Sequence, residues 1–194
     1  MKKIGVMISG GGSNLQSIID ATILGDINGE VVLVVSTNRN AFGLQRAIKH
    51  GIATFVAPKS EYRTLDERFE AVGDQLIEQG VDLVVLAGCL AILPKAFVER
   101  FKGKLINIHP SLLPKYGGKG FYGKRVHQAV IDQGDKVSGC TVHYVDEGTD
   151  TGEIIGQCEV EVKREDTAES LSARILPYEH SLLVEVIAKL LKED

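Results

Sequence analysis

The 194-residue sequence contains no tryptophan and only three cysteines, two methionines and five prolines. Cys89, Cys140 and Cys158 are odd in number and far apart, with no C-x-x-C pair. This pattern predicts unpaired thiols in a reducing compartment and argues against a disulfide framework or a zinc framework. No stretch approaches the roughly 20 apolar residues of a membrane helix, and the apolar run at 4–8 is too short for a signal peptide. We therefore expect a cytoplasmic protein that is not embedded in a membrane.

The chain also has no strong excess of one charge, with 22 Lys and Arg against 26 Asp and Glu and a net charge of −4. That balance argues against a broad surface for nucleic acid or for an anionic membrane. Apolar residues make up 44% and charged residues 25%, as in ordinary globular proteins. The length suits one domain with one large core, so we expect a single domain over residues 1–194. Monomer and homodimer both stay open.

Apolar runs alternate with helical patterns through the first 110 residues. We expect strands at 4–9, 30–35, 53–57, 81–87 and 105–108, and helices at 14–24, at 41–50 and from 64 to a stop at Gly80. This alternation predicts a parallel, Rossmann-like sheet with helices on both faces. Two later strands, at 137–145 and 154–162, have no helix between them and must be antiparallel neighbours. A final helix is expected at about 167–192, which completes an α/β fold with C-terminal antiparallel strands.

A glycine-rich stretch, SGGGSN at 9–14, lies between the first strand and the first helix. Glycines let the backbone approach a ligand closely, and the free N–H groups at a helix start bind anions. The stretch is not a dinucleotide fingerprint, because Leu15 occupies the third glycine position, and no Gly-Lys-Ser/Thr of a P-loop follows. We favour a phosphate site here. A tight turn in which Ser13 or Asn14 caps the helix is the alternative.

The strand at 105–108 leads directly into His109 and Pro110, with Asn107 two residues before the histidine. The two side chains offer an acid/base group beside a neutral hydrogen-bond donor. A histidine that only binds a backbone carbonyl at the strand end is the alternative. In the loop at 146–152, Asp150 is placed to lie beside His109 and to favour its protonated form; a solvated acidic turn is the alternative. The loop spacing does not fit a calcium site, no histidine pair has zinc spacing, and no metal is expected.

Together, SGGGSNL at 9–15, HPSLLP at 109–114 and Asp150-Thr151-Gly152 resemble the phosphoribosylglycinamide formyltransferases, the folate-dependent transformylases of purine synthesis. The resemblance covers essentially the whole chain, with the motifs in the family's order. It implies a single-domain formyltransferase fold, with residues 1–100 on the phosphate side and the remainder on the folate and catalytic side. It also implies formyl transfer from 10-formyltetrahydrofolate, a co-substrate, to the amine of glycinamide ribonucleotide.

The resemblance assigns roles to individual positions. Asn107 would stabilise the oxyanion, His109 would act as general acid, and Asp150 would keep His109 protonated. The ribonucleotide would contact Gly12, Ser13, Asn14 and Glu179. The folate pocket would contain Arg63, near the glutamate tail, with Leu90, Ala91, Ile92, Leu93, Asn107, Asp146, Glu147, Gly148, Thr149 and Asp150.

Three other functions share parts of the pattern. A formyltetrahydrofolate hydrolase would use the same histidine region with water as acceptor, and normally carries a regulatory domain ahead of it. A methionyl-tRNA formyltransferase needs a further C-terminal domain and a basic face for RNA. A non-catalytic phosphate-binding module has no need for Asn107, His109 and Asp150 together. A requirement for glycinamide ribonucleotide discriminates among these functions.

Overall fold

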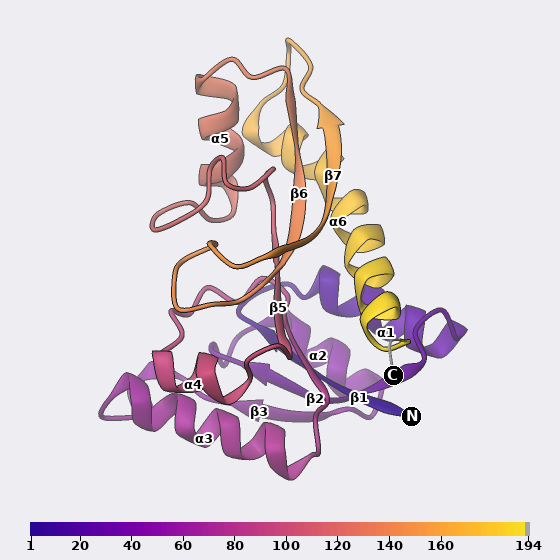
Figure 1. The fold of residues 1–194 in the computed structure, drawn as a ribbon, viewed down its shortest axis with the longest axis vertical. Coiled ribbons are helices and arrows are strands. Elements are labelled where there is room, and N and C mark those ends of the chain that lie inside the picture. Colours follow the sequence, from indigo (N-terminus) through magenta and orange to yellow (C-terminus); the bar gives the residue numbers. More distant parts are fainter. Residues whose placement is uncertain (193–194) are drawn as a thin grey trace.

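The computed structural model describes residues 1–192 and contains one seven-stranded sheet in the order β3-β2-β1-β4-β5-β6-β7, with helices on both faces (Figure 1). Five strands are parallel, namely β1 (Lys2–Ile8), β2 (Gly29–Ser36), β3 (Ala53–Val56), β4 (Leu83–Leu86) and β5 (Leu105–His109). β6 (Val137–Tyr144) pairs with β5 in the antiparallel sense, and β7 (Ile154–Glu161) pairs antiparallel to β6. The predicted sheet is therefore confirmed, including its antiparallel extension.

Two buried clusters divide the helices between the faces of the sheet. One face is covered by α1 (Ser13–Leu24), α2 (Phe42–Lys49), α5 (Lys124–Asp132) and α6 (Ala168–Leu190), and the other by α3 (Leu65–Glu78) and α4 (Lys95–Arg100). A 3-10 turn at Lys59–Glu61 precedes α3. The central strands β1 and β4 are buried on both sides, which explains why they are continuous apolar runs. Among residues 1–192, no helix combines the length and apolar character needed to cross a membrane.

Two of these helices were not predicted from the sequence. α4 has only six residues, which is too short for a helical period to stand out. α5 follows the Gly-rich segment 117–123, and its buried side chains at Val126 and Val130 form only one apolar repeat. The final helix was predicted, and Thr167 begins it with a capping box in which Ser170 takes part.

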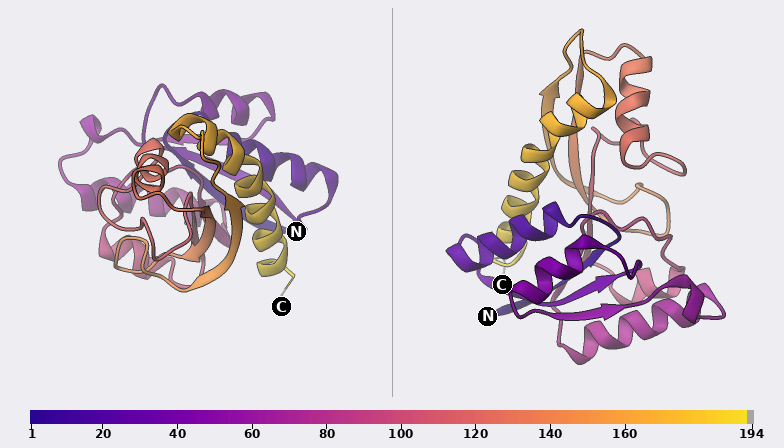
Figure 2. Two further views of the ribbon diagram at one scale, coloured as in Figure 1. Left: turned by 90° about the horizontal axis from the view of Figure 1, so that it is seen from above. Right: turned by 180° about the vertical axis from the view of Figure 1, so that it is seen from behind.

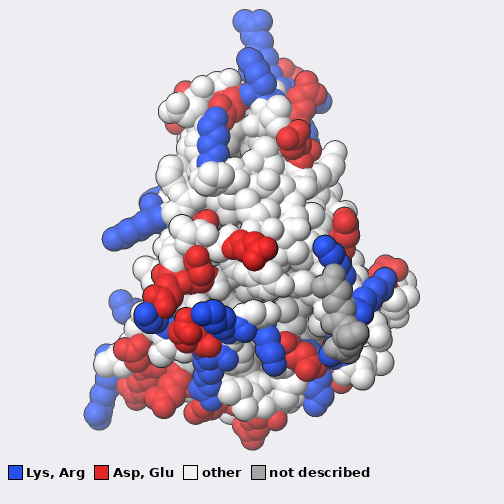
Figure 3. All heavy atoms as spheres, in the orientation of Figure 1, with Lys and Arg blue, Asp and Glu red and all other residues white. Residues whose placement is uncertain are grey.

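The topology brings the carboxyl ends of three strands together. β1 lies between β2 and β4, so the crossovers leave it in opposite directions, and ligands of α/β sheets bind at such a point. The register pairs Met7 with Leu86 and Leu86 with Asn107, which aligns the ends of β1, β4 and β5. Figure 2 shows β6, β7, α5 and part of α6 projecting beyond the parallel strands. Acidic and basic side chains are mixed on the face shown in Figure 3, in keeping with the small net charge.

Candidate active site

His109 is the last residue of β5 and is 4% exposed. Its Nε2 lies 2.8 Å from the carbonyl oxygen of Tyr116, and its Nδ1 lies 3.5 Å from Oδ2 of Asp150. A carbonyl oxygen can only accept, so Nε2 carries a hydrogen and Nδ1 is the nitrogen beside the carboxylate. The structure thus brings the His109 and Asp150 side chains together. The alternative, a backbone carbonyl as partner, is also present, because the two contacts use opposite ring nitrogens.

Asp150 is held in place by its loop. Its side chain is 12% exposed, and its Oδ2 accepts a hydrogen bond of 3.0 Å from the Gly118 N–H. Asp146 organises the turn ahead of it by accepting from the Gly148 N–H at 3.0 Å and from the Thr151 hydroxyl at 2.7 Å. The alternative of a merely solvated acidic turn is therefore wrong for Asp150.

Asn107 lies opposite His143 in the β5–β6 pairing, and its Nδ2 is 3.2 Å from the Nε2 of His143. The Nδ1 of His143 is 2.8 Å from the carbonyl oxygen of Tyr144 and must donate to it. Nε2 of neutral His143 therefore accepts from Asn107, which orients the amide and leaves its second N–H for a ligand. Burial, the largest influence, lowers the pKa of His143 and keeps it neutral. Sequence reasoning assigned no role to His143, although strand alternation allowed it to face this site.

A further histidine lies on α5. His127 is buried in the first turns of that helix, and its Nδ1 has no hydrogen-bond partner among residues 1–192. Burial, and secondarily the charge of His109, lower the pKa of His127 to about 4. It is therefore a neutral neighbour of the site at physiological pH.

The glycine-rich loop begins α1 without a side-chain cap in the described structure, so the alternative in which Ser13 or Asn14 caps the helix is wrong. Gly12 is the N-cap, with φ 70°. Asn14 instead donates from Nδ2 to Oε2 of Glu179 on α6, at 3.0 Å. Glu179 is only 9% exposed, and this burial raises its pKa in spite of the hydrogen bond from Asn14. The structure thus brings the predicted phosphate loop and the predicted ribonucleotide acid together.

The predicted folate residues of 90–93 follow β4 and contact the glycine loop. The Leu90 N–H donates to the Ser9 hydroxyl at 2.9 Å, and the Ser9 N–H donates to the Gly88 carbonyl at 3.1 Å. Leu90 and Ile92 are 62% and 73% exposed, so their side chains are free to meet a ligand. Lys95, which the sequence did not single out, pairs with Glu147 at 2.8 Å and joins this segment to the acidic loop at 146–150.

Arg63 lies apart from this group. It is an exposed residue in the turn before α3, and its N–H donates to the Glu67 carboxylate at 2.9 Å. No described contact joins it to the other site residues, and its role at the folate tail stays a prediction. Within the described part of the chain, no cluster of three His, Cys, Asp or Glu side chains forms a metal site.

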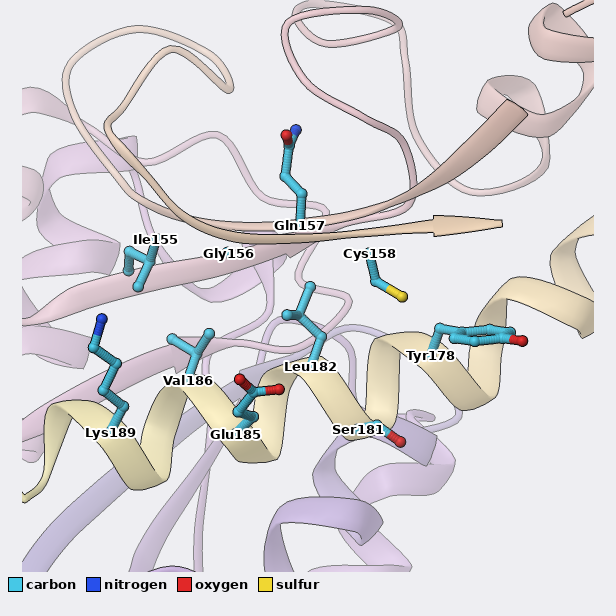
Figure 4. A pocket seen from close by; sticks show the side chains of 10 residues that line it. All are labelled: Ile155, Gly156, Gln157, Cys158, Tyr178, Ser181, Leu182, Glu185, Val186 and Lys189. Carbon is cyan, nitrogen blue, oxygen red and sulfur yellow. The ribbon is translucent and has the colours of Figure 1, made fainter. Parts of the chain in front are cut away.

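A separate hollow of about 290 Å³ lies between the edge strand β7 and α6 (Figure 4). All of its lining residues belong to these two elements. Among them, the Gln157 side chain turns away from α6 and bonds to the loop that follows His109, at 2.9 Å from the Leu113 carbonyl. The hollow is thus distinct from the His109 site.

Comparison with known proteins agrees with this architecture. Residues 2–187 match the model of the formyl transferase family. The chain therefore belongs to that family, whose fold it shares over almost its whole length.

Individual relatives show to which group of formyl transferases the chain is similar. Phosphoribosylglycinamide formyltransferase of Haemophilus influenzae is 44% identical over 187 residues, which cover 96% of this chain and 86% of the relative. Glycinamide ribonucleotide transformylase 1 of Symbiobacterium toebii superposes with a TM-score of 0.94 at 38% identity, over 99% of this chain and 88% of that one. The chloroplastic enzyme of Arabidopsis thaliana is 42% identical, covering 99% of this chain. The chain spans only 66% and 62% of the two plant relatives. Within the formyl transferases, the chain groups with the phosphoribosylglycinamide formyltransferases.

Proposed function

We propose that this protein transfers the formyl group of 10-formyltetrahydrofolate to the amine of glycinamide ribonucleotide. The products are formylglycinamide ribonucleotide and tetrahydrofolate, in de novo purine biosynthesis. The observation that carries the proposal is the arrangement around His109, in which Asp150 lies 3.5 Å from Nδ1 and Asn107 is oriented by His143. This arrangement opens at the same sheet edge as the glycine loop.

The reaction begins when the ribonucleotide amine attacks the formyl carbon. The carbonyl oxygen becomes an oxyanion, and the free N–H of Asn107 donates to it, a contribution of several kcal/mol in preorganised sites. Protonated His109, charge-balanced by Asp150, stabilises the same oxygen. The bond to folate nitrogen then breaks, with a proton passing to that nitrogen and another lost from the attacking amine. Because Nε2 is bound to Tyr116, His109 exchanges its proton through Nδ1.

The substrates would approach from two sides. The ribonucleotide phosphate fits the start of α1, where the N–H groups after Gly12 have no side-chain cap in the described structure. Buried Glu179, which accepts a hydrogen bond from Asn14, would also accept from the rest of the ribonucleotide. The folate would lie along 90–93 and 146–150, two segments that the Lys95–Glu147 pair joins. Both are small molecules, and neither requires a metal. The free thiols of Cys89, Cys140 and Cys158 support a reducing, cytoplasmic location.

The test is to incubate the protein with 10-formyltetrahydrofolate and follow tetrahydrofolate release with and without glycinamide ribonucleotide. Release that requires the ribonucleotide, yields its formylated product and persists in the presence of a chelator supports the proposal. Release at the same rate without the ribonucleotide would identify a formyltetrahydrofolate hydrolase instead. His109→Ala is the control for background hydrolysis.

A further inference from the structure

The loop that follows His109 is tied down along most of its length. The Thr141 hydroxyl on β6 donates to the Ser111 carbonyl at 2.6 Å and accepts from the Leu113 N–H at 3.1 Å. Gln157 on β7 donates to the Leu113 carbonyl at 2.9 Å. These bonds hold the first half of the loop against the antiparallel strands. Beyond Leu113, the buried Ser111 hydroxyl donates to the Lys115 carbonyl at 2.6 Å. The Tyr116 carbonyl that accepts from His109 belongs to the next residue.

The end of the loop is held by Asp135, which lies in the turn between α5 and β6. Lys115 places its Nζ 2.7 Å from both carboxylate oxygens of Asp135. The Tyr116 hydroxyl donates to Oδ2 of the same carboxylate, also at 2.7 Å. The Tyr116 ring packs edge-on against Phe121, with centroids 6.0 Å apart. We call the contacts of Lys115, Tyr116 and Asp135 the Asp135 clamp.

Tyr116 needs such support because of its backbone. Its φ is 55°, in the left-handed region that a residue with a Cβ seldom adopts. Within residues 1–192, Tyr116 and Asp150 are the two non-glycine residues with positive φ, and they contact opposite nitrogens of the His109 ring. Strained conformations of this kind persist where the surrounding structure enforces them, and they cluster at functional sites.

We propose that Asp135 is a positioning residue for the reaction: through Lys115 and Tyr116 it holds the Tyr116 carbonyl against His109 Nε2. Neutral His109 then keeps its hydrogen on Nε2, and Nδ1 always faces Asp150 and the substrates. Asp135 makes this contribution without touching His109 itself. The catalytic consequence rests on the proposed formyl transfer, whereas the position of the hydrogen is a property of the resting protein.

The protonation states of the clamp fit this role. Burial, and then the hydrogen bond to Asp135, raise the pKa of Tyr116 to about 12, so the phenol remains a donor at neutral pH. Hydrogen bonds from Lys115 and Tyr116 lower the pKa of Asp135, so the carboxylate remains ionised. The hydrogen bond between the Tyr116 hydroxyl and the Asp135 carboxylate is therefore intact at neutral pH.

The test compares Tyr116→Phe, which keeps the ring and removes only the hydroxyl, with Asp135→Ala and the double variant. Glu169→Gln is the matched control, because it breaks the exposed Lys124–Glu169 pair at 2.8 Å on α5 and α6. The first readout is 15N NMR of the His109 ring in the substrate-free protein, followed upward in pH until the ring signals stop shifting, so that the plateau reports which nitrogen of the neutral ring carries hydrogen. The second is kcat and KM for formyl transfer.

The wild type and Glu169→Gln should show hydrogen on Nε2 alone, and the two clamp variants a mixture of both tautomers. In the clamp variants kcat should fall about tenfold while each KM stays within about twofold, since misplacing a catalytic group slows chemistry. The double variant should lose no more than Asp135→Ala, because the residues act as one unit.

A wild-type tautomer in Tyr116→Phe and Asp135→Ala would overturn the proposal, and so would a tautomer change that leaves kcat intact. Circular dichroism and melting temperature show whether Asp135→Ala still folds, and Tyr116→Phe alone decides the question if it does not. If the wild type shows no formyl transfer at all, the proposed function fails. The tautomer result then still decides whether Asp135 positions His109.

Discussion

Replacing Asp150 with asparagine keeps the size of the side chain and removes a charge that lies 3.5 Å from His109 Nδ1. Two unit charges at this separation attract each other by about 5 kcal/mol at an effective dielectric constant of about 20. Asp150 is 12% exposed, so water offsets part of that attraction. We expect a net loss of about 3–4 kcal/mol of transition-state stabilisation, which corresponds to a fall in kcat of about 10²–10³-fold.

The assay is a double-mutant cycle on kcat with Asp150→Asn, His109→Ala and the combined variant. If Asp150 acts through His109, the combined variant should be about as slow as His109→Ala, since the lost charge has no imidazolium left to stabilise. Asp132→Asn on α5 serves as the control, because it neutralises an exposed carboxylate that binds only Gln128 in the described structure. Losses in kcat that multiply in the combined variant would refute the pairing and give Asp150 an independent role.

Three further predictions concern the phosphate loop, acid stability and Glu179. In Gly11→Val the added Cβ meets no protein atom within 4 Å, so the fold should persist while the side chain obstructs the phosphate. The KM for the ribonucleotide should rise about tenfold, which corresponds to about 1.4 kcal/mol of lost binding energy. Gly12→Val should instead lower the melting temperature, because its Cβ would lie 2.7 Å from the Gly43 Cα. The pKa of His127 is about 4 in the folded protein and about 6.5 in the unfolded chain. The free energy of unfolding, measured by urea titration, should therefore fall by about 3 kcal/mol as the pH drops from about 6.5 to about 4. His127→Gln should make this pH dependence weaker. Because burial raises the pKa of Glu179, its ionisation opposes folding as the pH rises, and Glu179→Gln should raise the melting temperature at pH 8. The same variant should raise the KM for the ribonucleotide, because it removes the proposed carboxylate contact. An unchanged KM would contradict the placement of the ribonucleotide.

Much of the fold was predictable because its signals are local. β2 is a continuous apolar run, and α3 carries a regular apolar stripe that begins at its cap, Thr64. Alternation of such elements leaves few topologies other than a parallel sheet. The two helices that the sequence did not predict, α4 and α5, lack such local signals. α4 is too short and α5 too polar on its exposed side for periodicity to reveal them, and tertiary packing of Phe97 and Val130 stabilises them instead.

The residue types of the candidate site were also readable along the chain. Asn107 and His109 share one side of a strand because side chains alternate with period two, and Gly12 adjoins a helix start. These placements involve neighbours in sequence, so the sequence by itself determined them, together with the family resemblance that the comparisons confirm.

The partners of those residues were decided only by tertiary structure. Antiparallel pairing of β5 with β6 sets His143 opposite Asn107, and the packing of α6 on α1 brings Glu179 to Asn14. Tyr116 and Asp135 meet because the loop after β5 folds back on the α5–β6 turn. No local propensity encodes such contacts. They form because burying the apolar faces of distant elements aligns the polar groups at their ends, and those alignments set which nitrogen of His109 carries its hydrogen.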